Sequence, residues 1–265
     1  MRMSHAVIGL IVLLLLWQAG VSVFEPPRYI LPSPAAVTSA FLRQPGFLAW
    51  HSLITLTEIA AGLIVGSVLG AATAFGVAAW PRIGRLVWPM VLILQALPVF
   101  VLAPILVIWL GFGLASKVAM TTIIIFFPIA SSFADGLRRT ERDILDAAEL
   151  DGANHWQALV GIRVPLAIPA LVSGLRVAAP LAPLGAVVGE WVGAAGGLGF
   201  IMVQANARMQ TDTVFAAMFV LAVLTLVLRL LVDRLTAGLA PWASELRDDK
   251  AFSQSSIQSR SFTRS

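Results

Sequence analysis

Six long apolar runs constrain the fold of this sequence more than any other feature. They lie at 6–24, within 52–79, within 87–110, within 117–133, at about 167–190 and at about 213–235. A helix needs about 20 apolar residues to cross the hydrocarbon core of a bilayer, and 58% of the 265 residues are hydrophobic while 12% are charged. We therefore expect an all-α integral membrane protein with about six transmembrane helices, and the composition excludes an ordinary soluble domain.

The segments between and after the runs indicate one membrane domain with a tail. Residues 1–243 form the predicted transmembrane domain, with a Pro-rich outer connection at 25–50, in which EPPRYILPSP is extended, and a long inner connection at 134–166. The polar residues 244–265 are predicted to be a disordered tail. The first run could instead be a cleaved signal peptide, but its length and the lack of a clear cleavage site favour a retained span.

Basic residues are distributed unevenly between the two sides of the membrane. If the N-terminus is inside, twelve of the 18 arginines and lysines fall in inner connections or termini. The outer connections hold four, which are Arg28, Arg43, Lys117 and Arg208. Because positive charge favours the cytoplasmic side, both termini are predicted to be cytoplasmic. The basic balance thus reflects topology and anionic lipid headgroups, and no nucleic-acid partner is expected.

Small residues recur at every fourth position of the second run. Gly62, Gly66, Gly70 and Ala74 share one helical face, which permits close contact with another helix. Packing against a helix of the same subunit is the favoured interpretation, and a seam between two copies is the alternative.

The third run contains Pro89, Pro98 and Pro104, which kink helices and free backbone carbonyls. It is either a kinked structural helix or a helix that lines a translocation path, to which Gln95 and the bend at Pro98 could contribute.

Ionisable residues inside membrane spans are functional candidates. Glu190 and its neighbour Trp191 lie where the fifth run meets the outer face, and they are predicted either to take part in substrate passage or to anchor the helix at the interface. Glu58 lies about two turns into the second run, and we expect a structural ion pair with Arg43 or Arg208.

The long inner connection contains a predicted helix-turn-helix. ERDILDAAEL (141–150) has one apolar stripe among charges and is predicted to be a short surface helix. Gly152 can leave that helix with a positive φ, and NHWQALVGIRV (154–164) is predicted to be a second short helix, which Pro165 and Pro169 end. A unit this small cannot bury its own apolar side chains, so it needs a partner.

The same connection resembles the EAA loop of bacterial ABC importer permeases. The family pattern is EAA, three residues, G, nine residues, I, one residue, LP, and the spacing fits throughout. The matching residues are Asp146, Ala147, Ala148, Gly152, Ala153, Ile162, Val164 and Pro165. Asp replaces Glu at 146 and Val replaces Leu at 164, and both changes keep the charge or the apolar character.

Further motifs resemble the nitrate/sulfonate/taurine branch of these permeases: YILPSP (29–34), LPVFVLAPILVIWLGFG (97–113) and GGLGFIM (196–202), with similarity over about 29–236. The resemblance implies a type I ABC importer permease fold in the bacterial cytoplasmic membrane. It implies that two copies pair, that each EAA loop docks into a separate ABC ATPase, and that a substrate-binding protein delivers the solute. Residues 141–160 would then transmit ATP-driven closure to the spans.

The sequence offers no means of hydrolysing ATP. It has no GxxxxGK[ST] motif, and neither lysine follows a glycine. No cofactor is expected on this chain, and ATP and Mg are expected on the partner ATPase. The absence of cysteine and the scattered His5, His51 and His155 give no metal site, and no nucleophile, base and orienting group cluster, so we do not expect an enzyme.

The solute is the least determined property. The stretch at 187–212 resembles most the permeases assigned to pyrimidine precursors of thiamine, and then those for sulfonates, taurine and nitrate. An ion-coupled secondary transporter is the alternative. It would predict paired intramembrane carboxylates, broken helices in both halves and internal symmetry, none of which we find in the sequence. A structural scaffold would leave the inner loop unexplained.

Overall fold

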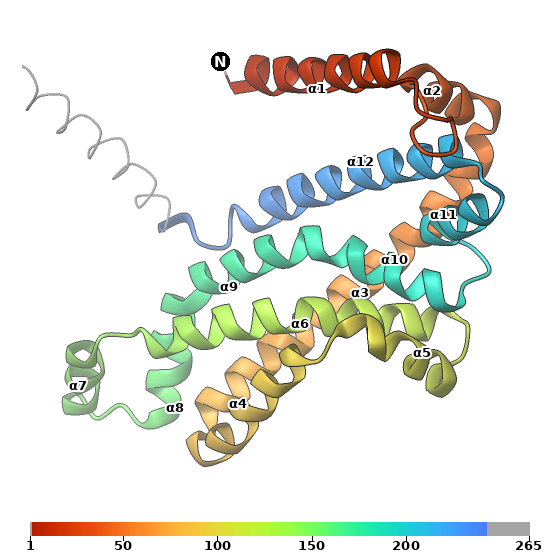
Figure 1. The fold of residues 1–265 in the computed structure, drawn as a ribbon. Helices are drawn as coiled ribbons and strands as arrows, with labels where there is room; N and C mark the ends of the chain where they lie inside the picture. The colour runs from red at the N-terminus through yellow and green to blue at the C-terminus, as the bar shows by residue number, and fades with distance from the viewer. Residues whose placement is uncertain (1, 243–265) are drawn as a thin grey trace, which may run out of the picture. The chain divides into compact units, whose positions relative to one another are not determined.

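The computed structural model describes residues 2–242, which are helical and contain no strand (Figure 1). In chain order the helices are α1 (Arg2–Phe24), α2 (Pro34–Arg43), α3 (Pro45–Ala79), α4 (Pro81–Ala96), α5 (Val99–Leu110), α6 (Leu114–Arg138), α7 (Arg142–Leu150), α8 (His155–Ala158), α9 (Val164–Ala178), α10 (Ala182–Gly193), α11 (Leu198–Ala207) and α12 (Thr211–Thr236). A π-helical segment, Leu159–Arg163, joins α8 to α9, and a 3-10 turn, Ala179–Leu181, joins α9 to α10.

Four helical stretches are long and apolar enough to cross a membrane: α3, α6, the continuous stretch His155–Gly193, and α12. The helices α4 and α5 add a fifth span if they count as one broken span. The predicted count of six is therefore not confirmed. The first predicted run is helical as α1, but among the described residues it contributes only the shorter apolar helix Ile11–Phe24.

The helices divide into two compact units that interleave along the chain. The described residues of the first unit are 2–66, 97–125 and 180–227, and those of the second are 67–96, 126–179 and 228–242. The helices α3, α6 and α12 each begin in the first unit and end in the second. Each functional feature below lies within one unit.

The small-residue stripe of α3 packs on α6 of the same chain. A Cβ added at Gly62 would lie 2.5 Å from Thr121 Cβ, and one added at Gly66 would lie 2.6 Å from Ile125 Cγ1. The contact positions rise together along both helices, so α3 and α6 run parallel and in register. The favoured interpretation, packing within one subunit, is confirmed.

The third predicted span is broken at the second of its three prolines, Pro98. α4 ends at Ala96 and α5 begins at Val99, with Pro98 as its N-cap. A proline has no amide N–H for the ladder and disfavours a helical residue before it, which accounts for the break at Leu97.

Two predicted boundaries need correction. The outer connection at 25–50 contains a complete helix, α2, whose first turn is capped by Ser33, and α3 already begins at Pro45. Pro165 and Pro169 do not end the second short helix as predicted, because helical structure continues through them. The ring of Pro165 crowds the carbonyl four residues earlier, and that residue, Gly161, lies in the wider π-helical turn. The predicted tail at 244–265 lies outside the described residues.

Candidate functional site

The inner connection folds as predicted into a short exposed helix, a turn and a second short helix. α7 spans Arg142–Leu150 and buries none of its residues. Its apolar side chains face outward: Leu150 is 91% exposed and Ile144 is 40% exposed. A nine-residue helix is marginal by itself in water, so the exposed apolar stripe indicates a surface that another protein covers.

The turn after α7 is fixed by backbone geometry. Gly152 has φ +84°, and its N–H donates to Glu149 O at 2.9 Å, while the Ala153 N–H donates to Ala148 O at 2.9 Å. This pair of bonds is the Schellman arrangement, which needs a residue tolerant of positive φ at the glycine position. The spacing from Ala148 to Gly152 and Ala153 is therefore the one that the Schellman hydrogen bonds at the end of α7 require.

The second helix, α8, is capped at its N-terminus and contacts the end of α3 within the second unit. Asn154 and Gln157 exchange side-chain and backbone hydrogen bonds as a capping box. The His155 ring bonds Ala79 O at 3.2 Å, at the end of α3, and Trp156 packs edge-on against Trp80 with ring centroids 5.6 Å apart.

The π-helical segment after α8 continues this attachment. Leu159 is fully buried in a core with side chains of α3, α6 and α9. Arg163 Nε donates to Leu137 O at 2.9 Å, near the end of α6. These contacts join α8 and the segment after it to the ends of α3 and α6.

The remaining loop residues of the EAA pattern differ in exposure. Asp146 and Ala147 are exposed, and Asp146 makes no hydrogen bond or ion pair within residues 2–242. Ile162 and Pro165 are partly buried in the helical continuation of α8. The structure thus places Asp146 and Ala147 on the exposed surface of α7. It places Ile162 and Pro165 in the part that joins the loop to α9.

A second feature, a buried polar cluster, surrounds Glu190 in the first unit. Glu190 is 2% exposed. Its carboxylate accepts a hydrogen bond from Thr55 Oγ1 at 2.6 Å and from the Gly199 N–H at 2.5 Å. Thr55 Oγ1 in turn accepts from the Leu198 N–H at 2.8 Å, and His51 Nδ1 accepts from the Gly197 N–H at 2.9 Å.

These bonds cap α11 from outside. Its N-cap residue is Gly197, which has no side chain to accept the first amide groups of the helix. Side chains of α3 and α10 accept them instead. Glycine is required on the other side of the contact as well, since a Cβ added at Gly199 would lie 2.7 Å from Glu190 Oε2.

Lys117 and Glu58 complete the cluster and correct two predictions. Lys117, expected in an outer connection, is 1% exposed in α6, where its ammonium donates to Phe112 O and Gly193 O. Glu58 is 4% exposed and its carboxyl lies against that of Glu190. The expected ion pair of Glu58 with Arg43 or Arg208 is wrong: neither pair forms within residues 2–242, and Arg43 lies 4.0 Å from Asp212.

The four predicted path residues do not form one site. Gln95 is exposed in α4, in the second unit. Pro98 is exposed at the start of α5, while Glu190 is buried in the cluster. Trp191 is 55% exposed and lines a cavity of about 700 Å³ between α10, α11 and α12. Its other lining side chains are mostly apolar, with Asn206 and Thr225 as polar exceptions.

The other side chains of the polar cluster were missed in the sequence. His51, Thr55 and Lys117 carry no motif, and each lies far from Glu190 along the chain. The available signal was the glycine-rich stretch after Trp191, because Gly197 and Gly199 leave room for a carboxylate.

Comparisons with known proteins identify the family. Residues 62–245 match the model of the family described as "Binding-protein-dependent transport system inner membrane component". A probable ABC transporter permease protein of Haemophilus influenzae is 43% identical over 84% of this chain and 91% of the relative.

Two relatives are named for a solute. The riboflavin transport system permease protein RibX of Chloroflexus aurantiacus is 35% identical over 89% of this chain and 88% of its own. The formylaminopyrimidine transport permease protein ThiX of Halalkalibacterium halodurans is 34% identical over 88% of this chain and 93% of its own.

The fold is that of a solved permease. A chain of the MetNI methionine ABC transporter, crystallised in inward-facing conformations, superposes with a TM-score of 0.64 at 20% identity and covers 74% of this chain and 98% of its own. The predicted type I ABC permease fold is confirmed.

Proposed function

The chain belongs to the family of binding-protein-dependent transport system inner membrane components, and from this premise we propose that it imports a small polar solute by alternating access. It is a multi-pass, non-catalytic permease subunit of an ABC transporter. ATP and Mg bind to a separate ATPase subunit in this proposal, because the sequence has no P-loop.

The observation that carries the proposal is the exposed helix-turn-helix of α7 and α8. Its apolar side chains Ile144 and Leu150 face outward, and α8 is bonded to the ends of α3 and α6 through His155 and Arg163. An ATPase groove that covers Leu150 would move α8, and α8 would move the ends of two spans. Asp146 is free to pair with a cation of the ATPase.

The complete transporter in this proposal contains two copies of this chain, two ATPases and an extracytoplasmic substrate-binding protein. It lies in the bacterial cytoplasmic membrane with both chain termini on the cytoplasmic side, where the arginine-rich connections belong. The loop of α7 and α8 then faces the cytoplasm, where ATP is available.

The cavity beside Trp191 supports a solute with a flat heteroaromatic ring. Its volume of about 700 Å³ lies in the range of small-molecule sites, and an indole face packs well on another ring. The relatives named for formylaminopyrimidine and riboflavin are 34% and 35% identical, against 28% for one named for taurine. A pyrimidine precursor of thiamine is our first choice of solute, before sulfonate, taurine or nitrate.

Two features are ones that an ion-coupled transporter would share: the adjacent carboxyls of Glu58 and Glu190, and the broken span of α4 and α5. Among residues 2–242 one span is broken in this way, whereas such a transporter has a break in both halves. Glu190 is already bonded to Thr55 and to the first turn of α11, so its role in this structure is to hold α11. The pair therefore does not favour ion coupling.

The test is co-purification of the ATPase with the permease from membranes. Leu150→Asp should weaken ATPase binding ten- to hundredfold or more, because a fully buried leucine is worth about 1.5–3 kcal/mol. Leu239→Asp is the control, since Leu239 is also exposed, at 50%, but follows α12. Unchanged ATPase binding by Leu150→Asp would contradict the proposal.

A further inference from the structure

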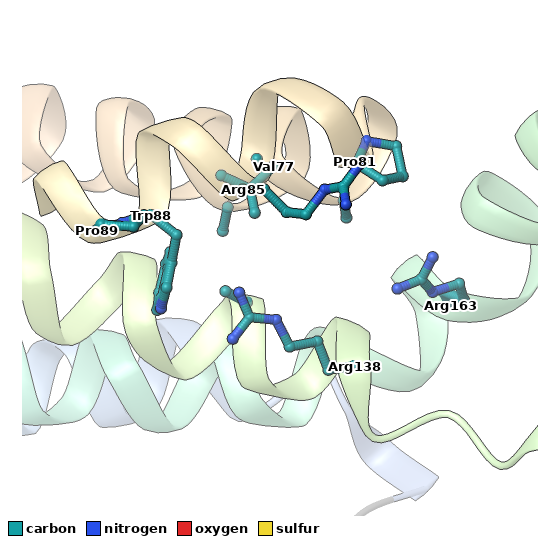
Figure 2. Close-up of a pocket in the computed structure, with 11 residues that line it drawn as sticks. Val77, Pro81, Arg85, Trp88, Pro89, Arg138 and Arg163 are labelled. Atoms are coloured by element: carbon teal, nitrogen blue, oxygen red, sulfur yellow. The ribbon is translucent and has the colours of Figure 1, made fainter. Parts of the chain in front are cut away.

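A cavity in the second unit gathers three arginines and a tryptophan. It has a volume of about 380 Å³. The lining residues come from α3, α4, α6 and the π-helical segment: Ala74, Val77, Ala78, Pro81, Gly84, Arg85, Trp88, Pro89, Ala134, Arg138 and Arg163. Figure 2 shows Trp88 directed from α4 toward α6, with Arg138 and Arg163 reaching into the same space.

The cavity has positive charge without matching negative charge. No acidic residue lines it. Arg85 makes no hydrogen bond or ion pair within the described part of the chain, and Arg163 uses only its Nε, on Leu137 O. Arg138 stacks over Trp88 at 4.6 Å, and its nearest carboxylate, Asp135, lies 3.9 Å away in a solvent-exposed pair, which is a weak interaction.

The wall of the cavity and the helix surface beside it are apolar. Ala74, Val77 and Pro89 line it together with the arginines. On α4, Leu86 is 70% exposed and Met90 is 59% exposed. A ligand that fits both parts has an anionic head for the guanidinium groups and a hydrocarbon part for α4.

We propose that this cavity binds the phosphate headgroup of an anionic phospholipid, whose acyl chains lie along α4. Guanidinium groups bind phosphate oxygens in pairs of parallel hydrogen bonds, and basic pockets between spans on the cytoplasmic side recognise such headgroups. Trp88 lies beside them, as aromatic rings do at the membrane interface. The placement in the inner leaflet rests on the cytoplasmic orientation given under the proposed function.

The bound lipid would support the helix-turn-helix of α7 and α8. Arg163 belongs to the segment that directly follows α8, and Ala79, which accepts from His155, lies at the end of the helix whose Ala78 lines the cavity. A phosphate held by Arg85, Arg138 and Arg163 joins α4, α6 and the π-helical segment where α8 is attached.

The experiment counts lipids bound to the purified full-length permease by native mass spectrometry, without the ATPase. Phosphatidylglycerol is compared with phosphatidylcholine, inorganic phosphate and glycerol phosphate. We expect tight binding of phosphatidylglycerol alone, weakened about fivefold by Arg85→Gln and again by Arg138→Gln. Arg82→Gln is the matched control, because Arg82 lies in the same helix but does not line the cavity.

The other results would overturn the proposal in distinguishable ways. Equal binding of inorganic phosphate would identify a site for a soluble anion. Equal weakening by Arg82→Gln would show unspecific surface attraction. Unchanged binding of phosphatidylglycerol by Arg85→Gln and Arg138→Gln would show that these arginines do not hold the headgroup. Thermal unfolding of each variant, with a midpoint near that of the wild type, confirms that it is folded. Because no ATPase is present, the lipid result is independent of whether the permease couples to one.

Discussion

Thr55 and Glu190, which are 135 positions apart in the chain, share a hydrogen bond of 2.6 Å in the interior of the first unit. The same hydroxyl accepts from the Leu198 N–H at 2.8 Å, which one hydroxyl can do while it donates. Thr55 thereby connects α3 to the carboxylate of α10 and to the first turn of α11.

Replacing this hydroxyl should destabilise the permease. Thr55→Val keeps the shape of the side chain but leaves buried groups on Glu190 and Leu198 without a partner, at a cost of about 1–3 kcal/mol. The measurement is the thermal unfolding midpoint in detergent. Thr57→Val is the control, since Thr57 is exposed and bonds only Ile54 O of its own helix. Equal midpoints for the two variants would contradict the capping role.

The close approach of Gly199 to Glu190 predicts non-additive substitutions. Gly199→Ala introduces a Cβ 2.7 Å from Glu190 Oε2, so it should be less costly once Glu190→Ala has removed the carboxylate. The expected coupling is about 0.5–3 kcal/mol, typical of contacting residues, measured as unfolding free energy in a double-mutant cycle. Gly238→Ala, where no atom lies within 4 Å of the added Cβ, should be additive with Glu190→Ala.

The turn after α7 predicts a defect in coupling when its glycine is replaced. Gly152→Ala places a Cβ at φ +84°, which costs about 1–2 kcal/mol, and should reduce stimulation of the ATPase by substrate. Gly152→Asn should be milder, because asparagine tolerates this region. Gly161→Ala, in the same connection without positive φ, should leave ATPase stimulation intact. If substrate stimulates the ATPase equally in all three variants, the geometry of this turn has no part in coupling.

The parallel packing of α3 on α6 predicts non-additive substitutions within one chain. Gly66→Ala adds a Cβ 2.6 Å from Ile125 Cγ1, and overpacking of this kind costs about 1–3 kcal/mol. Gly66→Ala should therefore cost less in a chain that already carries Ile125→Ala, measured as the unfolding free energy in a double-mutant cycle. Gly76→Ala is the control, as its Cβ meets nothing within 4 Å. A seam between two copies would give no such coupling with Ile125→Ala.

The cavity beside Trp191 predicts a separation of uptake from coupling. Trp191→Ala should lower the uptake of a labelled pyrimidine while ATPase binding stays normal, because the lost ring lies in α10 and not in the loop. Trp109→Ala is the matched control, since Trp109 is 76% exposed on α5 and does not line the cavity. Normal uptake by Trp191→Ala would remove this cavity from the path.

The helix-turn-helix of α7 and α8 could be predicted from the sequence because the residues that determine it are close together in the chain. The apolar stripe of 141–150, the glycine at 152 and the N-cap Asn154 act within one or two turns, and α7 begins and ends within one residue of the predicted bounds. The stripe from Gly62 to Ala74 was predictable for the same reason, since four-residue spacing defines a helix face.

The polar cluster could not be predicted, because its contacts join distant residues. Lys117 was assigned to an outer connection since the predicted span began there, whereas α6 begins at Leu114 and includes it. Glu58 was paired with the wrong groups because burial against Glu190 depends on tertiary packing. Gly197 and Gly199 signal that some group approaches them closely, but they do not identify that group as Glu190.

The Schellman turn at 148–153 separates the shape of the loop from the identity of its partner. Its hydrogen bonds are made by backbone atoms, so the residues of the motif specify the shape of the backbone. The outward side chains of Ile144, Asp146 and Leu150 therefore remain exchangeable. A permease of this kind could be retargeted to a foreign ATPase by redesigning those three positions alone, with the turn left untouched.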